Sequence, residues 1–165
     1  MIDLIILDLY GTLVGRGDNS HPRRGFADFM NRYQDKNIVL ATDDSSKKDV
    51  NRHLRSLSII DLLDGVYTGN DMTIIAGYED KRKNLKKICR DFKVNPNHAV
   101  FISDGKRDLE DAKRDKVRFI HVPYYEVEDE IFSFAMINLS GRMRRYLDLR
   151  DVNSGMAVEQ MKNHY

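Results

Sequence analysis

Two short segments of the sequence combine carboxylates with small residues in a way that suits phosphate or metal chemistry. Residues 8–12 (Asp-Leu-Tyr-Gly-Thr) directly follow an apolar stretch, and residues 103–108 (Ser-Asp-Gly-Lys-Arg-Asp) lie at the end of another. Asp8 is a candidate nucleophile or metal ligand, because a carboxylate can serve in either role. Asp104 and Asp108 can bring further acidic oxygens to a cation held by Asp8, and Mg²⁺ prefers such oxygen ligands.

A threonine and a lysine-rich stretch complete the candidate set. Thr42 and Asp43 follow a third apolar stretch, where a hydroxyl and the N–H groups at the start of a helix can hold phosphate. The competing interpretation is that either side chain simply caps that helix. Residues 81–87 are rich in lysine, and such runs are usually solvated. A lysine that reaches inward from this run would offset the charge of the carboxylates and of an incoming phosphate.

Alternating strands and helices are expected to position these residues. The apolar runs are short and rich in β-branched residues, which is typical of strands buried on both faces. The alternation predicts an α/β fold with a mainly parallel sheet and helices on both faces. Because ligands bind beyond the carboxyl ends of the strands in such sheets, we expect Asp8, Thr42 and Asp104 to meet there. The expected strands are residues 4–7, 38–41, 66–67, 99–102 and 117–122, and the expected helices pass through residues 26–33, 50–57, 81–92 and 109–112.

Residues 124–165 are patterned differently and are expected to form a C-terminal helical extension packed on a core domain of residues 1–123. Apolar residues recur at helical spacing within residues 131–139 and again within residues 143–150, which predicts helix. The sequence from Asn153 onward is polar and weakly patterned, so we expect that end to fray. A homodimer contact through the extension is a further interpretation of the same pattern.

Size and composition favour one globular domain that is not embedded in a membrane. The chain has 165 residues, a formal net charge of +1, 32% charged residues and 41% apolar residues, which excludes disorder and nucleic-acid binding driven by bulk charge. Its apolar runs are far shorter than the ~20 residues of a membrane span, and its N-terminus does not resemble a signal peptide. The single cysteine, Cys89, cannot form an internal disulfide, so a cytoplasmic location is expected. Basic side chains of residues 21–26, with Lys106 and Arg107, could still form a local positive rim for a polyanion.

Taken in order, these segments resemble the four motifs of the haloacid dehalogenase-like superfamily of hydrolases. They are an apolar strand followed by residues 8–12, an apolar strand followed by Thr42 and Asp43, a lysine, and residues 101–108. The resemblance covers roughly residues 1–123 and implies a Rossmann-like, three-layer α/β/α sandwich. It also implies Mg²⁺ as the cofactor and a phosphorylated substrate.

The resemblance implies a role for each acidic residue of the site. Asp8 would attack the substrate as the nucleophile and form an aspartyl-phosphate, which water would then hydrolyse. Mg²⁺ would be bound by Asp8, the Tyr10 carbonyl oxygen and Asp104, with Asp108 in support. Most of the chemistry would then be positioning and charge neutralisation around a phosphoryl group.

The remaining residues would bind the phosphate. Thr42 would hold the transferred phosphoryl group, with Asp43 and Gly11 beside the substrate, because a glycine allows close backbone approach. Lys81 is expected to screen the charge of nucleophile and phosphate. It is preferred because the lysine of related proteins commonly stands one turn before an apolar helix position, and Lys83 is the alternate.

One departure from the family pattern affects the expected activity. Family phosphatases usually carry a second aspartate two residues after the nucleophile, as general acid and base, but this chain has Tyr10 there. General acid–base catalysis typically contributes ~10²–10⁴-fold to the rate, so its loss would weaken ester hydrolysis. Asp-x-Tyr-Gly-Thr is similar to the first motif of the 2-haloacid dehalogenases, in which halide leaves without a proton.

The spacing of the motifs leaves no room for a full cap domain. Residues 13–41 and 43–80 are largely used by the expected helices and strands, so we expect an open site that accepts a large or accessible phosphorylated substrate. The leading prediction is a Mg²⁺-dependent phosphatase or phosphotransferase. The alternatives are a catalytically weak or inactive binding or regulatory protein and, third, a 2-haloacid dehalogenase.

Overall fold

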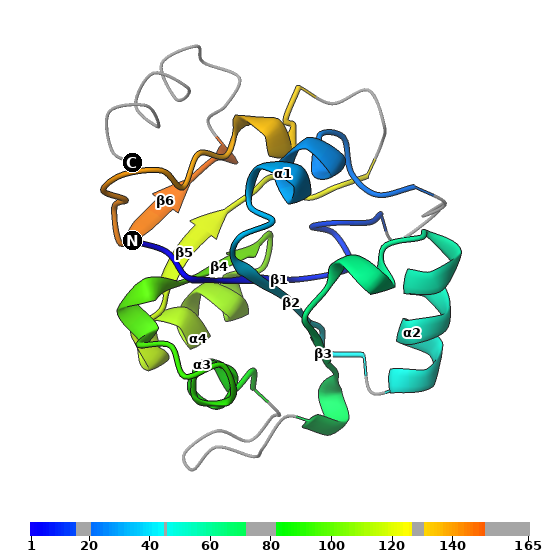
Figure 1. Cartoon of the computed structure of the whole chain (residues 1–165), viewed down its shortest axis with the longest axis horizontal. Helices are drawn as coiled ribbons and strands as arrows, with labels where there is room; N and C mark the ends of the chain where they lie inside the picture. Colours follow the sequence, from blue (N-terminus) through cyan, green and yellow to red (C-terminus); the bar gives the residue numbers. More distant parts are fainter. Residues whose placement is uncertain (16–20, 45, 72–81, 127–130, 151–165) are drawn as a thin grey trace.

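A sheet of six parallel strands forms the centre of the molecule (Figure 1). The computed structural model describes residues 1–15, 21–44, 46–71, 82–126 and 131–150. The strand order is β3-β2-β1-β4-β5-β6. The strands are β1 (Leu4–Leu7), β2 (Asn37–Ala41), β3 (Gly65–Tyr67), β4 (Ala99–Ser103), β5 (Arg118–His121) and β6 (Tyr146–Asp148).

Helices cover both faces of the sheet, which confirms the predicted three-layer α/β/α architecture. The α-helices are α1 (Phe26–Arg32), α2 (Lys47–Ser56), α3 (Leu85–Asp91) and α4 (Lys106–Asp115). Short 3₁₀ turns are η1 (Ile60–Leu62), η2 (Gly69–Asp71), η3 (Pro96–His98) and η4 (Phe134–Met136). None of the helices in the described part of the chain is long and apolar enough to cross a membrane.

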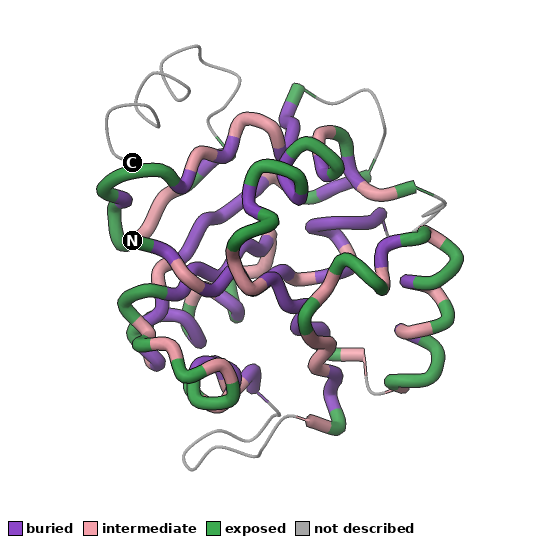
Figure 2. Tube along the Cα trace, in the orientation of Figure 1, coloured by how far each residue is buried: buried purple, intermediate pink, exposed green. Residues whose placement is uncertain are grey.

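The alternation of side chains along β1 divides the core between two layers. Ile5 and Leu7 pack in the cluster that includes apolar residues of α1 and α2, whereas Leu4 and Ile6 pack with those of α3 and α4. All four β1 residues are fully buried because helices lie on both faces, as expected for a parallel sheet. Figure 2 shows this buried centre surrounded by helices with exposed outer surfaces.

The strand order reverses between β1 and β4, and this places two loops side by side. From β1 the chain first continues to β2 and β3 on one side, and later crosses to β4 on the other side. Leu7 pairs with Ile102, so Asp8 and Asp104 leave the same edge of the sheet from neighbouring strands. Ligands of doubly wound folds bind at such a switch point.

The prediction of a C-terminal helix is wrong for residues 131–150. This segment forms the turn η4 and the edge strand β6, in which Tyr146 pairs with Phe119 of β5. Phe132, Ser133 and Phe134 are buried in succession, whereas Ile131 is 58% exposed, so burial does not follow the expected helical spacing. The end from Asn153 onward, which is expected to fray, lies outside the described part of the chain.

One glycine allows the C-terminal segment, as we call the described residues 124–126 and 131–150, to pack closely against the start of α1. Gly25 has φ of +80°, and a Cβ there would lie 2.1 Å from Ser133 Oγ and 2.7 Å from the backbone nitrogen of Ala135. The Phe134 N–H also donates to the Arg24 carbonyl oxygen at 2.9 Å. Both the backbone conformation and the available space therefore require glycine at position 25.

We predict that Gly25→Ala lowers the free energy of unfolding by about 3 kcal/mol, because it combines left-handed strain with overpacking. Urea unfolding followed by circular dichroism measures the change. Gly65→Ala is the matched control, since a Cβ at Gly65 would meet its neighbours at ordinary distances of 3.4–3.5 Å. Equal stabilities of the two variants would contradict the close packing described above.

Candidate active site

A cavity of about 760 Å³ opens at the carboxyl edge of the sheet, above the switch point between β1 and β4. Most of the residues predicted to form a site are brought together around it. Gly11 lies beside the cavity, since a Cβ there would be 2.9 Å from Asp104 Oδ2. Lys81 lies outside the described residues. The cavity is lined by Asp8, Tyr10, Thr42, Asp43, Asp44, Asp104, Gly105, Lys106, Arg107 and Asp108.

A buried lysine holds the Asp8 carboxylate at the tip of β1. Lys83 Nζ donates hydrogen bonds to Asp8 Oδ1 and to Asp108 Oδ2, each at 2.8 Å, and Lys83 is only 1% exposed. Ser103 Oγ donates to the same Asp108 oxygen at 2.7 Å. Lys83, the alternate of the sequence analysis, is therefore the lysine that the described structure brings to the site.

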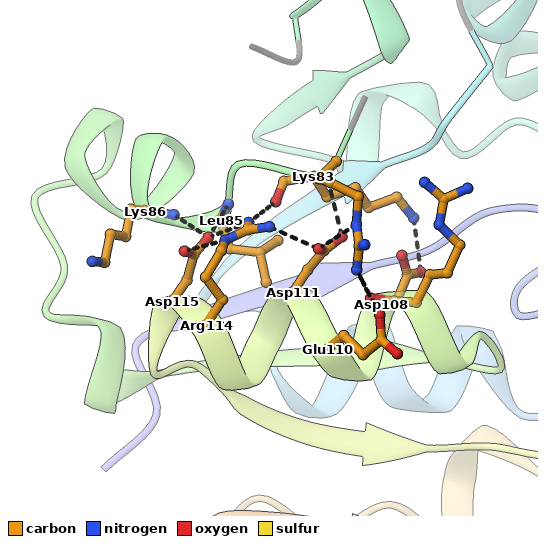
Figure 3. Close-up of polar contacts among 10 residues, drawn as sticks. Lys83, Leu85, Lys86, Asp108, Glu110, Asp111, Arg114 and Asp115 are labelled. Atoms are coloured by element: carbon orange, nitrogen blue, oxygen red, sulfur yellow. Dashed lines mark hydrogen bonds and ion pairs between the residues drawn. The ribbon is translucent and has the colours of Figure 1, made fainter. Parts of the chain in front are cut away.

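The backbone around Lys83 is fastened to α4 by carboxylates on one face of that helix (Figure 3). Asp111 Oδ2 accepts the Lys83 N–H at 3.1 Å, and Asp115 Oδ2 accepts the Leu85 N–H at 2.9 Å. Asp108, Asp111 and Asp115 recur at helical spacing and all are buried. This spacing is a signal in the sequence that could have identified α4 as the partner of the lysine segment.

Two arginines connect the same helix to the lysine segment. Arg82 Nε pairs with Asp111 Oδ1 at 2.9 Å, and its Nη2 pairs with Glu110 Oε2 at 2.9 Å. Arg114 pairs with Asp111 at 2.8 Å and also donates to the Lys83 carbonyl oxygen. Helix α3 therefore begins at Leu85, with Asn84 as its N-cap, and not at residue 81 as expected.

Thr12 connects the two carboxylates that face each other across the switch point. Its hydroxyl lies 3.1 Å from Asp8 Oδ2 and 2.8 Å from Asp104 Oδ1, and it accepts the Asp104 N–H at 3.0 Å. Because a hydroxyl has one proton, it can donate fully to only one of the two carboxylates at a time. The backbone of Asp104 has a further partner, because His121 Nε2 lies 2.8 Å from its carbonyl oxygen. His121 was not identified from the sequence.

Burial and the charge of Asp8 raise the pKa of both Asp104 and Asp108 and so disfavour their ionisation. Burial raises the pKa of Asp104, and the charge of Asp8 raises it further against the hydrogen bond from Thr12. Burial raises the pKa of Asp108 to about 7, although Lys83 opposes this shift. For Lys83, burial alone would lower the pKa, but Asp8 and Asp108 outweigh it and raise the pKa above its usual value. The site therefore holds a charged lysine and carboxyl groups that a further cation would stabilise.

The donor atoms of the site fit Mg²⁺. In the part of the chain that the structure describes, no three His, Cys, Asp or Glu side chains are close enough to form a complete metal cluster. Mg²⁺ does not need such a cluster, because it commonly takes one or two carboxylates and keeps several waters. Asp8 and Asp104 supply two carboxylates around the Thr12 hydroxyl. Asp108 directs one oxygen toward Lys83, which suits a supporting role.

The Tyr10 side chain contacts a histidine of α2. Tyr10 stacks on His53 of α2, with ring centroids 5.9 Å apart and its hydroxyl 3.3 Å from His53 Nδ1. Burial raises the pKa of the Tyr10 phenol, as do nearby carboxylates, so the phenol stays protonated at neutral pH.

Thr42 does not cap α2, because Ser46 does so by accepting the N–H of Asp49. Thr42 is instead buried at the wall of the cavity.

Comparisons with known proteins agree with this fold. A profile of haloacid dehalogenase-like hydrolases matches residues 5–122. Similar solved structures include a HAD-superfamily hydrolase of subfamily IA from Geobacter sulfurreducens, with 15% identity, 83% of this chain and 98% of that chain covered, and a TM-score of 0.62. CbbY from Rhodobacter sphaeroides, in complex with phosphate, shows 18% identity, coverages of 82% and 96%, and a TM-score of 0.60.

A haloacid dehalogenase-like hydrolase from Streptococcus pneumoniae shows 12% identity, covers 94% of this chain and 97% of that chain, and gives a TM-score of 0.61. At such identities the structural likeness shows the fold alone. A search of curated protein sequences gave no significant match.

We predict that Lys83→Met lowers the free energy of unfolding by about 3–5 kcal/mol near pH 8, because it leaves two carboxylates without their buried partner. Near pH 5 the loss should be smaller. A carboxyl with a raised folded-state pKa binds more protons in the folded state, so the stability of the variant falls as the pH rises. Urea unfolding at both pH values measures the difference.

The control for this experiment is Lys86→Met, since Lys86 is exposed on α3. That variant should match the wild type within about 0.5 kcal/mol at both pH values. A Lys83→Met variant as stable as this control at pH 8, or one with the same loss at both pH values, would contradict the buried ion pair.

Proposed function

Because this chain belongs to the haloacid dehalogenase-like hydrolase family, we propose that it is a Mg²⁺-dependent phosphatase or phosphotransferase that acts through an aspartyl-phosphate on Asp8. The observation that carries the proposal is the Asp8 carboxylate at the tip of β1. Its Oδ1 accepts a 2.8 Å hydrogen bond from buried Lys83, and the residue borders a cavity that Thr42 and Asp104 also line. The phosphate bound by CbbY agrees with this chemistry.

The proposed reaction has two displacement steps. In the first, an Asp8 oxygen attacks phosphorus, the bond between phosphorus and the leaving oxygen breaks, and that oxygen departs with the bonding electrons. Lys83 and Thr42 would offset the charge of the phosphoryl oxygens and keep them in place. In the second step, water or an acceptor hydroxyl attacks phosphorus and loses its proton to solvent, the bond between phosphorus and the Asp8 oxygen breaks, and the Asp8 carboxylate is released.

The residues that would hold Mg²⁺ are Asp8, Asp104 and the carbonyl of Tyr10. When bound, Mg²⁺ would supply positive charge next to the phosphoryl oxygens. Asp108 would keep Lys83 pointing toward Asp8, and Ser103 would steady Asp108 by donating to the same carboxylate oxygen. Thr12 would set the separation of Asp8 and Asp104 through its hydroxyl.

Tyr10 limits the substrates that such a site can process. A protonated phenol with a raised pKa is a weak acid, and the Tyr10 hydroxyl already shares a hydrogen bond with His53 Nδ1. The leaving oxygen must therefore depart with little help from a proton, so acyl or aryl phosphates should react faster than alkyl phosphates. The same observation favours the second candidate function, a catalytically weak binding or regulatory protein on this scaffold.

We further propose that the substrate is large or accessible. Only residues 8–25 connect β1 to α1, and only residues 68–84 connect β3 to α3, so neither connection is long enough for a full cap domain. The cavity rim carries Lys106 and Arg107, which are both exposed and suit a polyanionic substrate.

We predict that the protein releases phosphate from acetyl phosphate and p-nitrophenyl phosphate in the presence of Mg²⁺, and that Asp8→Asn lowers this rate by at least about 10³-fold because the nucleophile is lost. Asp61→Asn, in the exposed turn η1, is the control and should keep the wild-type rate. Absence of release from both substrates, with no stabilisation of the fold by beryllofluoride, would refute the proposed function.

A second prediction separates an attenuated enzyme from an inactive scaffold. Tyr10→Asp should raise kcat for an alkyl phosphate such as glycerol phosphate by about 10²-fold or more, because a carboxyl can protonate the leaving oxygen. The gain for p-nitrophenyl phosphate should be much smaller. Tyr10→Phe controls for loss of the hydroxyl alone. If Tyr10→Asp gains nothing on any substrate, the binding or regulatory function is favoured instead.

A further inference from the structure

Arg23 is a buried cation that contacts residues 8–14, the loop that carries the site residues and that we call the catalytic loop. Arg23 is 1% exposed, and its Nη1 donates to the Thr12 carbonyl oxygen at 3.1 Å. Its backbone N–H donates to the Leu13 carbonyl oxygen at 2.7 Å. Arg23 therefore contacts two consecutive peptide units of the catalytic loop, one of which belongs to the threonine between Asp8 and Asp104.

The guanidinium of Arg23 also lies over two aromatic rings of the C-terminal segment. Its central carbon is 4.4 Å from the ring centroid of Phe132 and 5.2 Å from that of Tyr125. Such positions over ring faces stabilise a cation, more so where water is excluded. The aromatic residues thus help to compensate for the cost of burying the charge, and they link Arg23 to the part of the chain that follows β5.

The C-terminal segment contacts the catalytic loop directly as well. The Tyr125 N–H donates to the Gly11 carbonyl oxygen at 2.8 Å. The ring of Tyr124 lies against Gly11, where a Cβ would be 2.8 Å from Tyr124 Cε2. The Gly11 carbonyl oxygen is therefore held by the Tyr125 N–H of the C-terminal segment, and the Thr12 carbonyl oxygen by Arg23, which packs on that segment.

If position 23 only filled the core, an apolar side chain would serve as well as the guanidinium or better. Burying a charge is expensive, and apolar residues of similar volume are often equally or more stabilising. What arginine adds is a rigid set of directional donors that can fix a carbonyl group while the plane stacks on a ring. Catalytic groups need to be held within about 0.5 Å of their productive geometry, so fixing the Thr12 peptide has consequences for the site.

We propose that Arg23 is a positioning residue for the catalytic loop, and that Tyr125 and Phe132 of the C-terminal segment act through it to complete the active site. The chain beyond residue 123 is then part of the catalytic architecture and not an accessory to a core domain that ends there. The consequence for catalysis rests on the proposed function, but the effect on the loop does not.

The test compares Arg23→Met with Arg32→Met by amide hydrogen exchange in the full chain. Arg32 is the matched control because its Nη1 also contacts the C-terminal segment, at the carbonyl oxygens of Ala135 and Ile137, and not the catalytic loop. The amides of Gly11 and Leu13 are hydrogen-bonded within the loop, so their exchange reports its order. We expect exchange at residues 11–14 to be about tenfold faster in Arg23→Met and near wild type in Arg32→Met, with β1 amides unchanged in both.

A second variant covers the case in which Arg23→Met does not fold. Phe132→Leu keeps an apolar side chain but removes the ring under the guanidinium, and we expect a smaller increase in exchange at the same loop amides. Arg23→Lys, which keeps the charge but not the planar donor set, should fall between Arg23→Met and wild type. If the loop amides of Phe132→Leu and of any folded Arg23 variant exchange as in the wild type, the proposal is overturned.

Catalysis provides a further readout if the proposed phosphatase activity is present. Arg23→Lys should lower kcat for p-nitrophenyl phosphate while KM stays near the wild-type value, because the loop positions the nucleophile more than it binds the substrate. Absence of both activity and beryllofluoride stabilisation, together with the expected exchange pattern, would refute the proposed function and leave the positioning role supported. Normal kcat together with unchanged exchange would refute the positioning role alone.

Discussion

A lysine ammonium buried between two carboxylates is the interaction on which the rest of the site depends. Lys83 Nζ lies 2.8 Å from oxygens of both Asp8 and Asp108, and the residue has almost no surface exposed to water. An ion in such a position is stable only if its partners stay in place, because unpaired buried charge costs several kcal/mol. This single contact therefore couples the tip of β1 to the first turn of α4 and to the segment before α3. The buried carboxylates of α4 hold that segment by its backbone, which leaves the ammonium little freedom to move.

The same interaction sets the electrostatic character of the cavity. Five aspartates line it, and Lys83 lies beneath them as a buried cation. Burial and the charge of Asp8 raise the pKa of Asp104, so a positive charge nearby would favour the ionised form of this carboxyl. A divalent ion beside Asp8 and Asp104 would supply that charge and would also favour an incoming phosphate. Tyr10 supplies no strong acid or base beside Asp8, so under the proposed mechanism a phosphoenzyme would form readily only from a substrate with a good leaving group.

Much of this arrangement could be predicted from the sequence, since apolar runs identify parallel strands and their carboxyl ends share an edge. Asp8 and Asp104 were expected to meet for that reason, and the structure brings them to one hydroxyl. The choice of lysine was less accessible, because it depends on where α3 begins, which Asn84 and the carboxylates of α4 decide. The prediction of helix for residues 131–150 failed because a short edge strand forms only through pairing with β5, and because the burial of Phe132 beside an exposed Ile131 departs from the helical spacing of the apolar residues. A buried arginine such as Arg23 looks like any solvated loop residue until its aromatic partners, far away in the chain, are known.

A crystal structure of the protein grown with Mg²⁺ and beryllofluoride, a mimic of the phosphoryl group, would decide whether the site works as proposed. We expect beryllium bonded to an Asp8 oxygen, Mg²⁺ ligated by Asp8 and Asp104, Lys83 against the mimic and Asp108, and Thr42 in contact with its fluorides. A structure in which the mimic and the metal are both absent from this cavity at saturating concentrations, or in which Lys83 points away from Asp8, would contradict the proposed site.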